Sequence, residues 1–200
     1  MQLYLKIVLI LLVFTSCVNR NNPLKKGDTI TGKVVSVIDG DTYDLLLKGN
    51  RKIRVRMEGI DAPERGMPFY KVSKNYLAQL CFNKKVSLDI TGIDGHDRFL
   101  GFTYLDDGSE LSHEMIKAGL AWHFKKYNSD TILSNLEIEA KKLKRGLWLN
   151  ENPMAPWTNR SLHRQEFQLK THLILCNKKK PTHRCKHICN SHKPTHRPKI

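Results

Sequence analysis

The stretch 51–65 joins a strand pattern to an acidic turn, and it constrains the fold more than any other part of the chain. Its first half alternates apolar with charged side chains, the apolar ones being Ile53, Val55 and Met57. This alternation predicts a half-buried β-strand. Pro63 fixes its own φ and disfavours helix at Ala62, so the turn that follows the strand is stiff. Taken alone, the stretch is equally typical of a charged strand face that ends in an ordinary surface turn.

Two further strand patterns precede this stretch. Residues 29–38 are rich in β-branched side chains, and residues 41–47 follow the tight-turn pair Asp39-Gly40. A second short turn at 48–50 leads into the alternating strand. We therefore predict three consecutive strands joined by short turns.

Helical and strand patterns alternate after the acidic turn. Pro68 suits the first position of a helix whose apolar residues recur at helical spacing as far as Leu80. Strands are predicted at 86–90 and 99–105, where apolar and β-branched residues gather again. The first helix therefore separates the third strand from the fourth.

Two helices are predicted after the fifth strand. Ser112 is expected to cap a short helix that ends at Gly119, and Asp130 a longer helix that reaches Leu147. This order of elements is that of an OB-fold barrel. The predicted fold is therefore α+β and mainly β: a five-stranded OB-fold barrel with about three helices, over residues 29–157.

The N-terminus has the features of an export signal. Lys6 precedes an apolar run at 7–14, and two small residues separate that run from Cys17. The run is too short for a permanent membrane span and fits a secretory signal peptide. A Cys at this place resembles the bacterial lipoprotein signal, so we predict a signal peptide at 1–16, lipidation of Cys17 and a linker at 17–28. Ordinary cleavage and a secreted product are the alternative.

Residues 158–200 form a basic tail rich in Cys and His. The chain has 34 Lys and Arg against 19 Asp and Glu, a net charge of +15, and the tail holds much of this excess. We predict a disordered arm that concentrates nucleic acid near the barrel. A small zinc site is one alternative, with the candidate ligands Cys176, Cys185, Cys189 and His192. A disulfide is another, although the tail's three cysteines would leave one unpaired.

Several charged residues match the needs of phosphodiester hydrolysis, which requires cations near the phosphate oxygens and a base for the attacking water. Asp41 starts the second strand and Asp61 follows the third, so neighbouring strands could bring these carboxylates together. Glu64 follows closely enough to reach the same cavity as a base. Arg56 lies on the polar side of the third strand, and Arg98 stands at the entrance to the fifth. Guanidinium suits phosphate because it stays charged and binds through two parallel hydrogen bonds.

These residues belong to motifs that resemble the staphylococcal nuclease (thermonuclease) family. The motifs are, in chain order, Asp39-Gly40-Asp41-Thr42, Arg56, Ile60-Asp61-Ala62-Pro63-Glu64, Asp94, Arg98 and Gly119-Leu120-Ala121. They cover about residues 29–150 in the family's order and approximate spacing. The resemblance implies an OB-type barrel and a Ca²⁺-dependent nuclease that acts on DNA and RNA and leaves 3′-phosphate ends.

The resemblance also implies roles for individual residues. Asp41 and Asp61 would bind Ca²⁺, with the backbone carbonyl of Ala62 as a further ligand. Glu64 would be the general base or would orient the water. The catalytic arginines, which would hold the phosphate and stabilise the transition state, are Arg56 and Arg98. The family often has Thr where Ala62 stands, and a backbone ligand survives that change.

The loop before the second arginine departs from the family's pattern. The family usually has Asp-x-Tyr-Gly-Arg, whereas this chain has Asp94-Gly95-His96-Asp97-Arg98. His96 would replace the aromatic ring that stacks on a nucleotide, and Asp97 adds a negative charge beside the arginine. Lys125 and Tyr127 are candidates for a further stacking and phosphate-contact surface, or for an exposed segment beside a helix.

We expect an exported, membrane-anchored and monomeric nuclease whose partners are DNA and RNA and whose cofactor is Ca²⁺. One alternative is a non-catalytic OB-fold lipoprotein that binds single-stranded nucleic acid. Another is a lipoprotein whose basic tail binds an anionic envelope polymer. The carboxylates, the base and the two arginines together favour the enzyme, because a binder would not need all of them.

Overall fold

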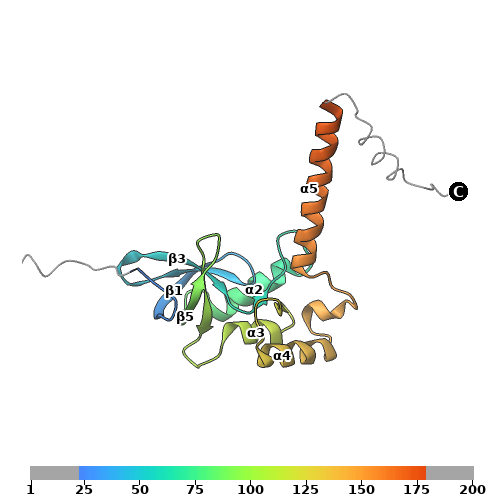
Figure 1. Cartoon of the computed structure of the whole chain (residues 1–200). Helices are drawn as coiled ribbons and strands as arrows, with labels where there is room; N and C mark the ends of the chain where they lie inside the picture. The colour runs from blue at the N-terminus through green and yellow to red at the C-terminus, as the bar shows by residue number, and fades with distance from the viewer. Residues whose placement is uncertain (1–22, 179–200) are drawn as a thin grey trace, which may run out of the picture.

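The computed structural model describes residues 23–178 (Figure 1). The predicted signal peptide and Cys17 lie outside this range, as do Cys185, Cys189, His192 and the side chain of Cys176. Lipidation and zinc binding therefore stay predictions. Between residues 23 and 178, no helix combines the length and the apolar character that a membrane span requires.

A closed barrel of five strands forms the body of the molecule. Its strands are β1 (Thr29–Val37), β2 (Thr42–Leu46), β3 (Lys52–Met57), β5 (Lys85–Ile93) and β6 (Phe99–Tyr104). The order around the barrel is β1-β2-β3-β6-β5, and β1 closes it by pairing with β5. The β3–β6 pair is parallel and the other pairs are antiparallel. This arrangement confirms the predicted OB-fold barrel.

The barrel interior is filled by the alternating apolar residues of the strands. On β3, Val55 and Met57 are buried, whereas Arg54 is exposed. Tyr43 on β2 is fully buried, and its hydroxyl is hydrogen-bonded to that of Thr103 at 2.7 Å. This bond satisfies a polar group that would otherwise be costly to bury. The pattern of residues 51–57 therefore predicted correctly which side of β3 faces the core.

Three helices accompany the barrel: α2 (Tyr70–Cys81), α3 (Leu111–Lys117) and α4 (Thr131–Lys142). The predicted starts of α2 and α3 are wrong. Pro68 lies in the turn before α2, because Phe69 adopts a left-handed conformation with φ of 63° and the helix begins after it. The cap of α3 is Glu110, whose carboxylate accepts the backbone N–H of Ser112, so Ser112 is inside the helix.

The predicted start of α4 is confirmed, since Asp130 accepts the backbone N–H of Ile132 at 2.7 Å. Its predicted extension to Leu147 is wrong, because α4 ends at Lys142. Two short 3₁₀ helices complete the body: η2 (Lys48–Asn50) and η3 (Gly146–Leu149). Trp148 in η3 packs edge-on against Trp122, with ring centroids 5.9 Å apart. This contact ties the end of the domain to its core.

A small two-stranded sheet lies apart from the barrel sheet and was not predicted. In it, β4 (Ile60–Asp61) pairs antiparallel with β7 (Trp122–His123). Strands of two residues are too short to show a periodic pattern in a sequence. The pairing holds the backbone at Asp61, and so it contributes directly to the site described below.

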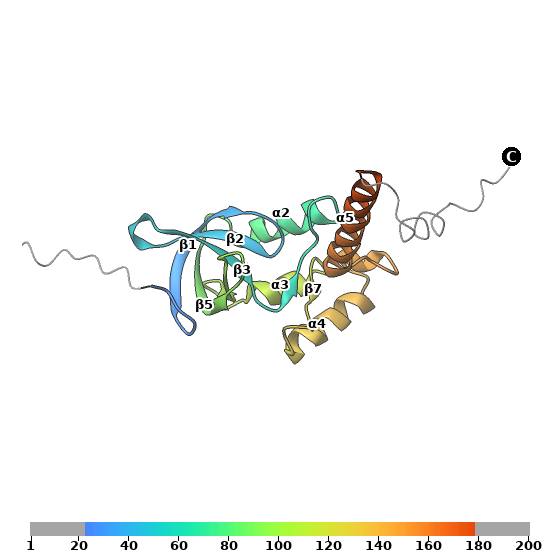
Figure 2. The ribbon, with the colours of Figure 1, turned by 45° about the horizontal axis from the view of Figure 1, so that its top comes forward.

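A fourth helix, α5 (Pro156–Lys178), corrects the prediction of a disordered tail for residues 158–178. Pro156 occupies the first helical position, and neither Gly nor Pro interrupts the chain before Lys178. The helix extends away from the body beyond its first turns (Figures 1 and 2), and most of its described side chains are exposed. Its basic and polar composition suggested disorder because it lacks the apolar face of a core helix.

Candidate active site

The site is built where β2 and β3 lie side by side. Asp41 directly precedes β2, and the β2–β3 register places Thr42 opposite Arg56. The chain approaches α2 closely at Gly40, where an added Cβ would overlap the Ser73 hydroxyl. Because Gly40 permits this approach, the turn delivers the carboxylate of Asp41 to the same edge as the guanidinium of Arg56.

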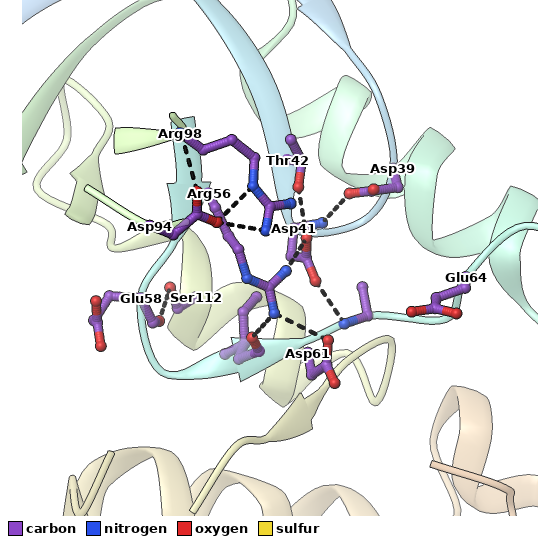
Figure 3. Close-up of polar contacts among 12 residues, drawn as sticks. Asp39, Asp41, Thr42, Arg56, Glu58, Asp61, Glu64, Asp94, Arg98 and Ser112 are labelled. Carbon is purple, nitrogen blue, oxygen red and sulfur yellow. Dashed lines mark hydrogen bonds and ion pairs between the residues drawn. The ribbon is translucent and has the colours of Figure 1, made fainter. Parts of the chain in front are cut away.

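Arg56 joins the two carboxylates that were predicted to bind metal (Figure 3). Its Nη1 lies 2.6 Å from Asp41 Oδ1, and its Nη2 lies 3.0 Å from Asp61 Oδ1. Asp41 and Asp61 are only 3% and 1% exposed. A buried charge needs compensating partners, so this guanidinium offsets part of the cost of burying two acidic groups together. The expected meeting of the carboxylates across neighbouring strands is therefore observed.

Asp41 is further held by two hydrogen bonds. The Thr42 hydroxyl donates to its Oδ1 at 2.7 Å, and the backbone N–H of Ala62 donates to its Oδ2 at 2.8 Å. Burial works to raise the pKa of Asp41, but Arg56 and these two donors outweigh it and hold the pKa below its ordinary value. The Ala62 bond also fixes the chain after β4, so Ala62 lies next to both carboxylates.

Asp39, two residues earlier, behaves in the opposite way. Burial and the negative charge of Asp41 raise the pKa of Asp39 from 3.8 to about 7. The turn therefore places one strongly ionised carboxylate beside one that titrates near neutrality.

Arg98 is positioned by Asp94. Its Nη2 lies 2.6 Å from Asp94 Oδ2, while Asp94 Oδ1 accepts the backbone N–H groups of His96 and Arg98. These bonds hold the loop together. Partial burial works to raise the pKa of Asp94, but the bonds outweigh it and hold the pKa below its ordinary value. Asp97 takes a left-handed conformation with φ of 58°, at the position where the family usually has Gly. The loop thus keeps a glycine-like backbone, and Arg98 pairs with Asp94 despite the extra charge.

Glu64 follows the stiff turn and contacts a residue that sequence reasoning missed. Its Oε1 lies 2.6 Å from Nη1 of Arg160, and the Nη2 of Arg160 lies 2.7 Å from Asp61 Oδ2. Arg160 belongs to α5, nearly a hundred residues further along the chain. No local pattern marks such a long-range contact, and Arg160 had been assigned to a tail without fixed structure.

A cleft of about 990 Å³ collects most of the predicted residues. Its walls include the buried cluster of Asp41, Arg56 and Asp61, and also residues from other elements, namely Glu64, His96, Arg98 and Tyr127. Lys125 is not among the residues lining this cleft. Its Nζ binds Glu137 at 3.0 Å, and it lines a neighbouring cavity of about 610 Å³ that also includes Tyr127. The structure therefore brings His96 and Tyr127 to the site but places Lys125 beside it.

The donor set is suited to a hard cation. Ca²⁺ prefers carboxylate and carbonyl oxygens, and the cleft offers Asp41, Asp61 and the backbone of Ala62. Within the described residues, no three or more His, Cys, Asp or Glu side chains are grouped so as to hold a metal ion. Ca²⁺ takes more oxygen ligands than these three groups supply, so water or a phosphate oxygen would complete its shell.

Comparisons with known proteins agree with this geometry. The family model described as "Staphylococcal nuclease homologue" matches residues 54–150, which include Arg56, Asp61, Glu64 and Arg98. An uncharacterized endonuclease of Haemophilus influenzae is 34% identical over 167 residues, covering 82% of this chain and 89% of that protein.

Two further relatives match a smaller part of the chain. An uncharacterized endonuclease of Escherichia coli is 37% identical over 128 residues, or 64% of this chain and 83% of that protein. A micrococcal nuclease of Shigella flexneri is 33% identical over 136 residues, or 63% of this chain and 78% of that protein. With this similarity and with the site's residues on a closed five-stranded barrel, the chain belongs to the staphylococcal nuclease family.

Proposed function

We propose that this chain is a nuclease that hydrolyses the phosphodiester bonds of DNA and RNA, depends on Ca²⁺ and leaves 3′-phosphate ends. The observation that carries the proposal is the buried Asp41–Arg56–Asp61 cluster on the wall of a cleft that Glu64 and Arg98 also line. A nucleic-acid binder gains nothing from two buried carboxylates, because they repel the phosphate backbone.

The arginines have the chemistry needed to hold a phosphate. Arg56 and Arg98 face the cleft with permanent positive charge, and a pentacoordinate phosphorus gains negative charge as it forms. Each arginine is oriented by a carboxylate, Arg56 by Asp41 and Arg98 by Asp94. This orientation is in place before substrate binds, which is the condition under which electrostatic stabilisation is most effective.

Glu64 is the candidate base for the attacking water. Its side chain is 36% exposed, so water has access to it, unlike the buried carboxylates of Asp41 and Asp61. A base must lie within hydrogen-bond reach of the proton that it removes. The stiff turn keeps Glu64 at the mouth of the same cleft in which the arginines lie.

Asp41, Asp61 and the carbonyl of Ala62 are the groups that would hold Ca²⁺. When bound, the ion would offset the negative charge of the phosphate and of the transition state. His96 and Tyr127 line the cleft and are suited to contact the nucleotides on either side of the scissile bond. We further propose that the chain is exported and lipidated at Cys17, which rests on the sequence of residues 1–17.

The proposal is tested by incubating the purified chain with plasmid DNA, single-stranded DNA and RNA, with Ca²⁺ or with a chelator. Degradation is expected only with Ca²⁺, and Glu64→Gln or Arg98→Ala should reduce it strongly. Glu166→Gln, on the exposed part of α5, is the matched control and should leave it unchanged. Binding without cleavage in Ca²⁺ would instead support the non-catalytic OB-fold binder.

A further inference from the structure

Two carboxylates of the site share a guanidinium that comes from outside the matched domain. Arg160 Nη2 lies 2.7 Å from Asp61 Oδ2, and Nη1 lies 2.6 Å from Glu64 Oε1 and 3.4 Å from Asp61 Oδ1. The family model ends at residue 150, whereas Arg160 lies on α5. A residue of an additional helix therefore contacts both a candidate metal ligand and the candidate base.

The start of α5 is anchored, which fixes where Arg160 lies. The Trp157 ring stacks on Phe124, with centroids 5.3 Å apart and an angle of 7° between the rings. Trp157 also packs edge-on against Trp122, whose β7 strand pairs with β4 at Asp61. Arg160 follows Trp157 by three residues, so the two side chains project from neighbouring positions on the same face of the helix. The stacking of Trp157 on Phe124 therefore places the Arg160 guanidinium next to Asp61 and Glu64.

Both oxygens of Asp61 are engaged by arginines. Oδ1 accepts from Arg56, and Oδ2 accepts from Arg160. A cation that used this carboxylate would have to replace at least one of these guanidinium contacts. Arg160 is the more replaceable of the two, because its side chain is 36% exposed whereas that of Arg56 is 15% exposed. Water can solvate a departing Arg160 at little cost.

We propose that Arg160 and a divalent cation compete for the carboxylate of Asp61, so that Arg160 is a positioning residue that sets the metal affinity of the site. The inference rests on the proposed Ca²⁺-dependent function. Arg160 would leave Asp61 when a cation occupies that carboxylate, and the same movement would leave Glu64 free to act as a base. The anchored Trp157 keeps the guanidinium near the cleft throughout.

A neighbouring arginine provides a matched control. Arg164 lies one turn further along α5 and lines the adjoining cavity with Lys125 and Lys126. Among the described residues, no ion pair links Arg164 to Asp61 or to Glu64. Its removal takes away the same charge from the same helix without touching the carboxylates.

The test is Ca²⁺ titration of the full chain by calorimetry, comparing wild type with Arg160→Ala, Arg160→Lys and Arg164→Ala. Arg160→Ala is expected to bind Ca²⁺ about tenfold more tightly, the change that follows from removing one pair of charge-assisted hydrogen bonds. The Ca²⁺ affinity of Arg160→Lys should lie between those of wild type and Arg160→Ala, because Lys keeps the charge but loses the bidentate fork. Arg164→Ala should match wild type. Arg160→Gln replaces the alanine variant if the latter does not fold.

A second readout is the rise in melting temperature that saturating Ca²⁺ produces. It should be larger for Arg160→Ala than for wild type, since tighter binding to the folded state stabilises it more. Equal affinities and equal rises in wild type and Arg160→Ala would overturn the competition and leave the proposed function standing. Failure of Arg160→Ala to bind Ca²⁺ at millimolar concentration would overturn both.

Discussion

The candidate site has two halves that differ in how they are held. The barrel half consists of Asp41, Arg56 and Asp61, which are nearly buried and supported by the β2–β3 and β4–β7 pairings. The rim half consists of Glu64 and Arg160, which are each 36% exposed and come from a turn and from α5. Ion pairs of similar length therefore occur in very different surroundings.

This difference in surroundings decides what each half can do. Breaking a buried pair leaves a charge without solvent, so the barrel half is costly to rearrange and suits the fixed part of a site. Water can replace the partners in the rim half, so that pair is weak and exchangeable. The rim half is thus suited to the groups that must move or exchange protons during a reaction.

The largest effect is expected from Arg56→Ala. It leaves Asp41 and Asp61 buried without their common partner, so unfolding in chelator should require about 3 kcal/mol less free energy. Nuclease activity should fall about a thousandfold, because a preorganised phosphate contact is lost. Denaturant titration and the rate of oligonucleotide cleavage measure the two losses.

Arg56→Lys is the matched variant, since it keeps the charge and loses the fork that spans two carboxylates. It should recover part of the stability and little of the activity. A stable, active Arg56→Ala variant would show that the barrel half is not the fixed part of the site.

Glu64→Gln should separate chemistry from stability. The rate of cleavage is expected to drop about a hundredfold, because the base is lost. The free energy of unfolding should change by less than about 1 kcal/mol, since both side chains of the pair with Arg160 are 36% exposed. Single-turnover kinetics and denaturant titration of the same preparation provide both numbers. A loss of stability as large as that of Arg56→Ala would remove the distinction between the halves.

Asp94→Ala tests the loop that positions Arg98. Without Asp94, the guanidinium loses its partner at 2.6 Å and the loop loses two backbone hydrogen bonds. The rate of cleavage should fall about tenfold at saturating substrate, because Arg98 is present but less well positioned. Asp97→Gly serves as the control, since glycine suits the left-handed backbone there and should preserve the rate.

The smallest effect concerns Asp39 and depends on pH. Because the folded-state pKa is raised from 3.8 to about 7, ionised Asp39 costs stability, and this cost grows as pH rises from about 4 to about 7. Asp39→Asn should therefore raise the melting temperature in chelator by a few degrees at pH 8, and the gain should vanish near pH 4. Thermal melts across that range measure it, and a gain that does not depend on pH would contradict the assigned pKa.

The same contrast explains how much could be predicted from the sequence. The barrel half could be predicted because the alternation on residues 51–57 and the turn signals indicate the strand order. That order brings Asp41, Arg56 and Asp61 together. The position of Glu64 followed from its closeness to Asp61 in the chain. These are consequences of local periodicity and short connections.

Only part of the rim half could be predicted from the sequence. Arg160 reaches the site through α5, whose docking depends on the stack of Trp157 on Phe124. That contact joins residues more than thirty positions apart and has no periodic signature. The two-residue strands β4 and β7 were missed for the related reason that pairing, rather than pattern, defines them. Local sequence signals were therefore enough to predict the barrel. The contacts that complete the site depend on tertiary packing, which the sequence does not show.

The most direct test of the account is the cleavage of one end-labelled single-stranded oligonucleotide by the wild-type chain, in Ca²⁺ and in chelator, with the product ends identified. The account predicts cleavage in Ca²⁺ alone and fragments that end in 3′-phosphate. Tight binding of the oligonucleotide without cleavage in Ca²⁺, or equal cleavage in chelator, would contradict it.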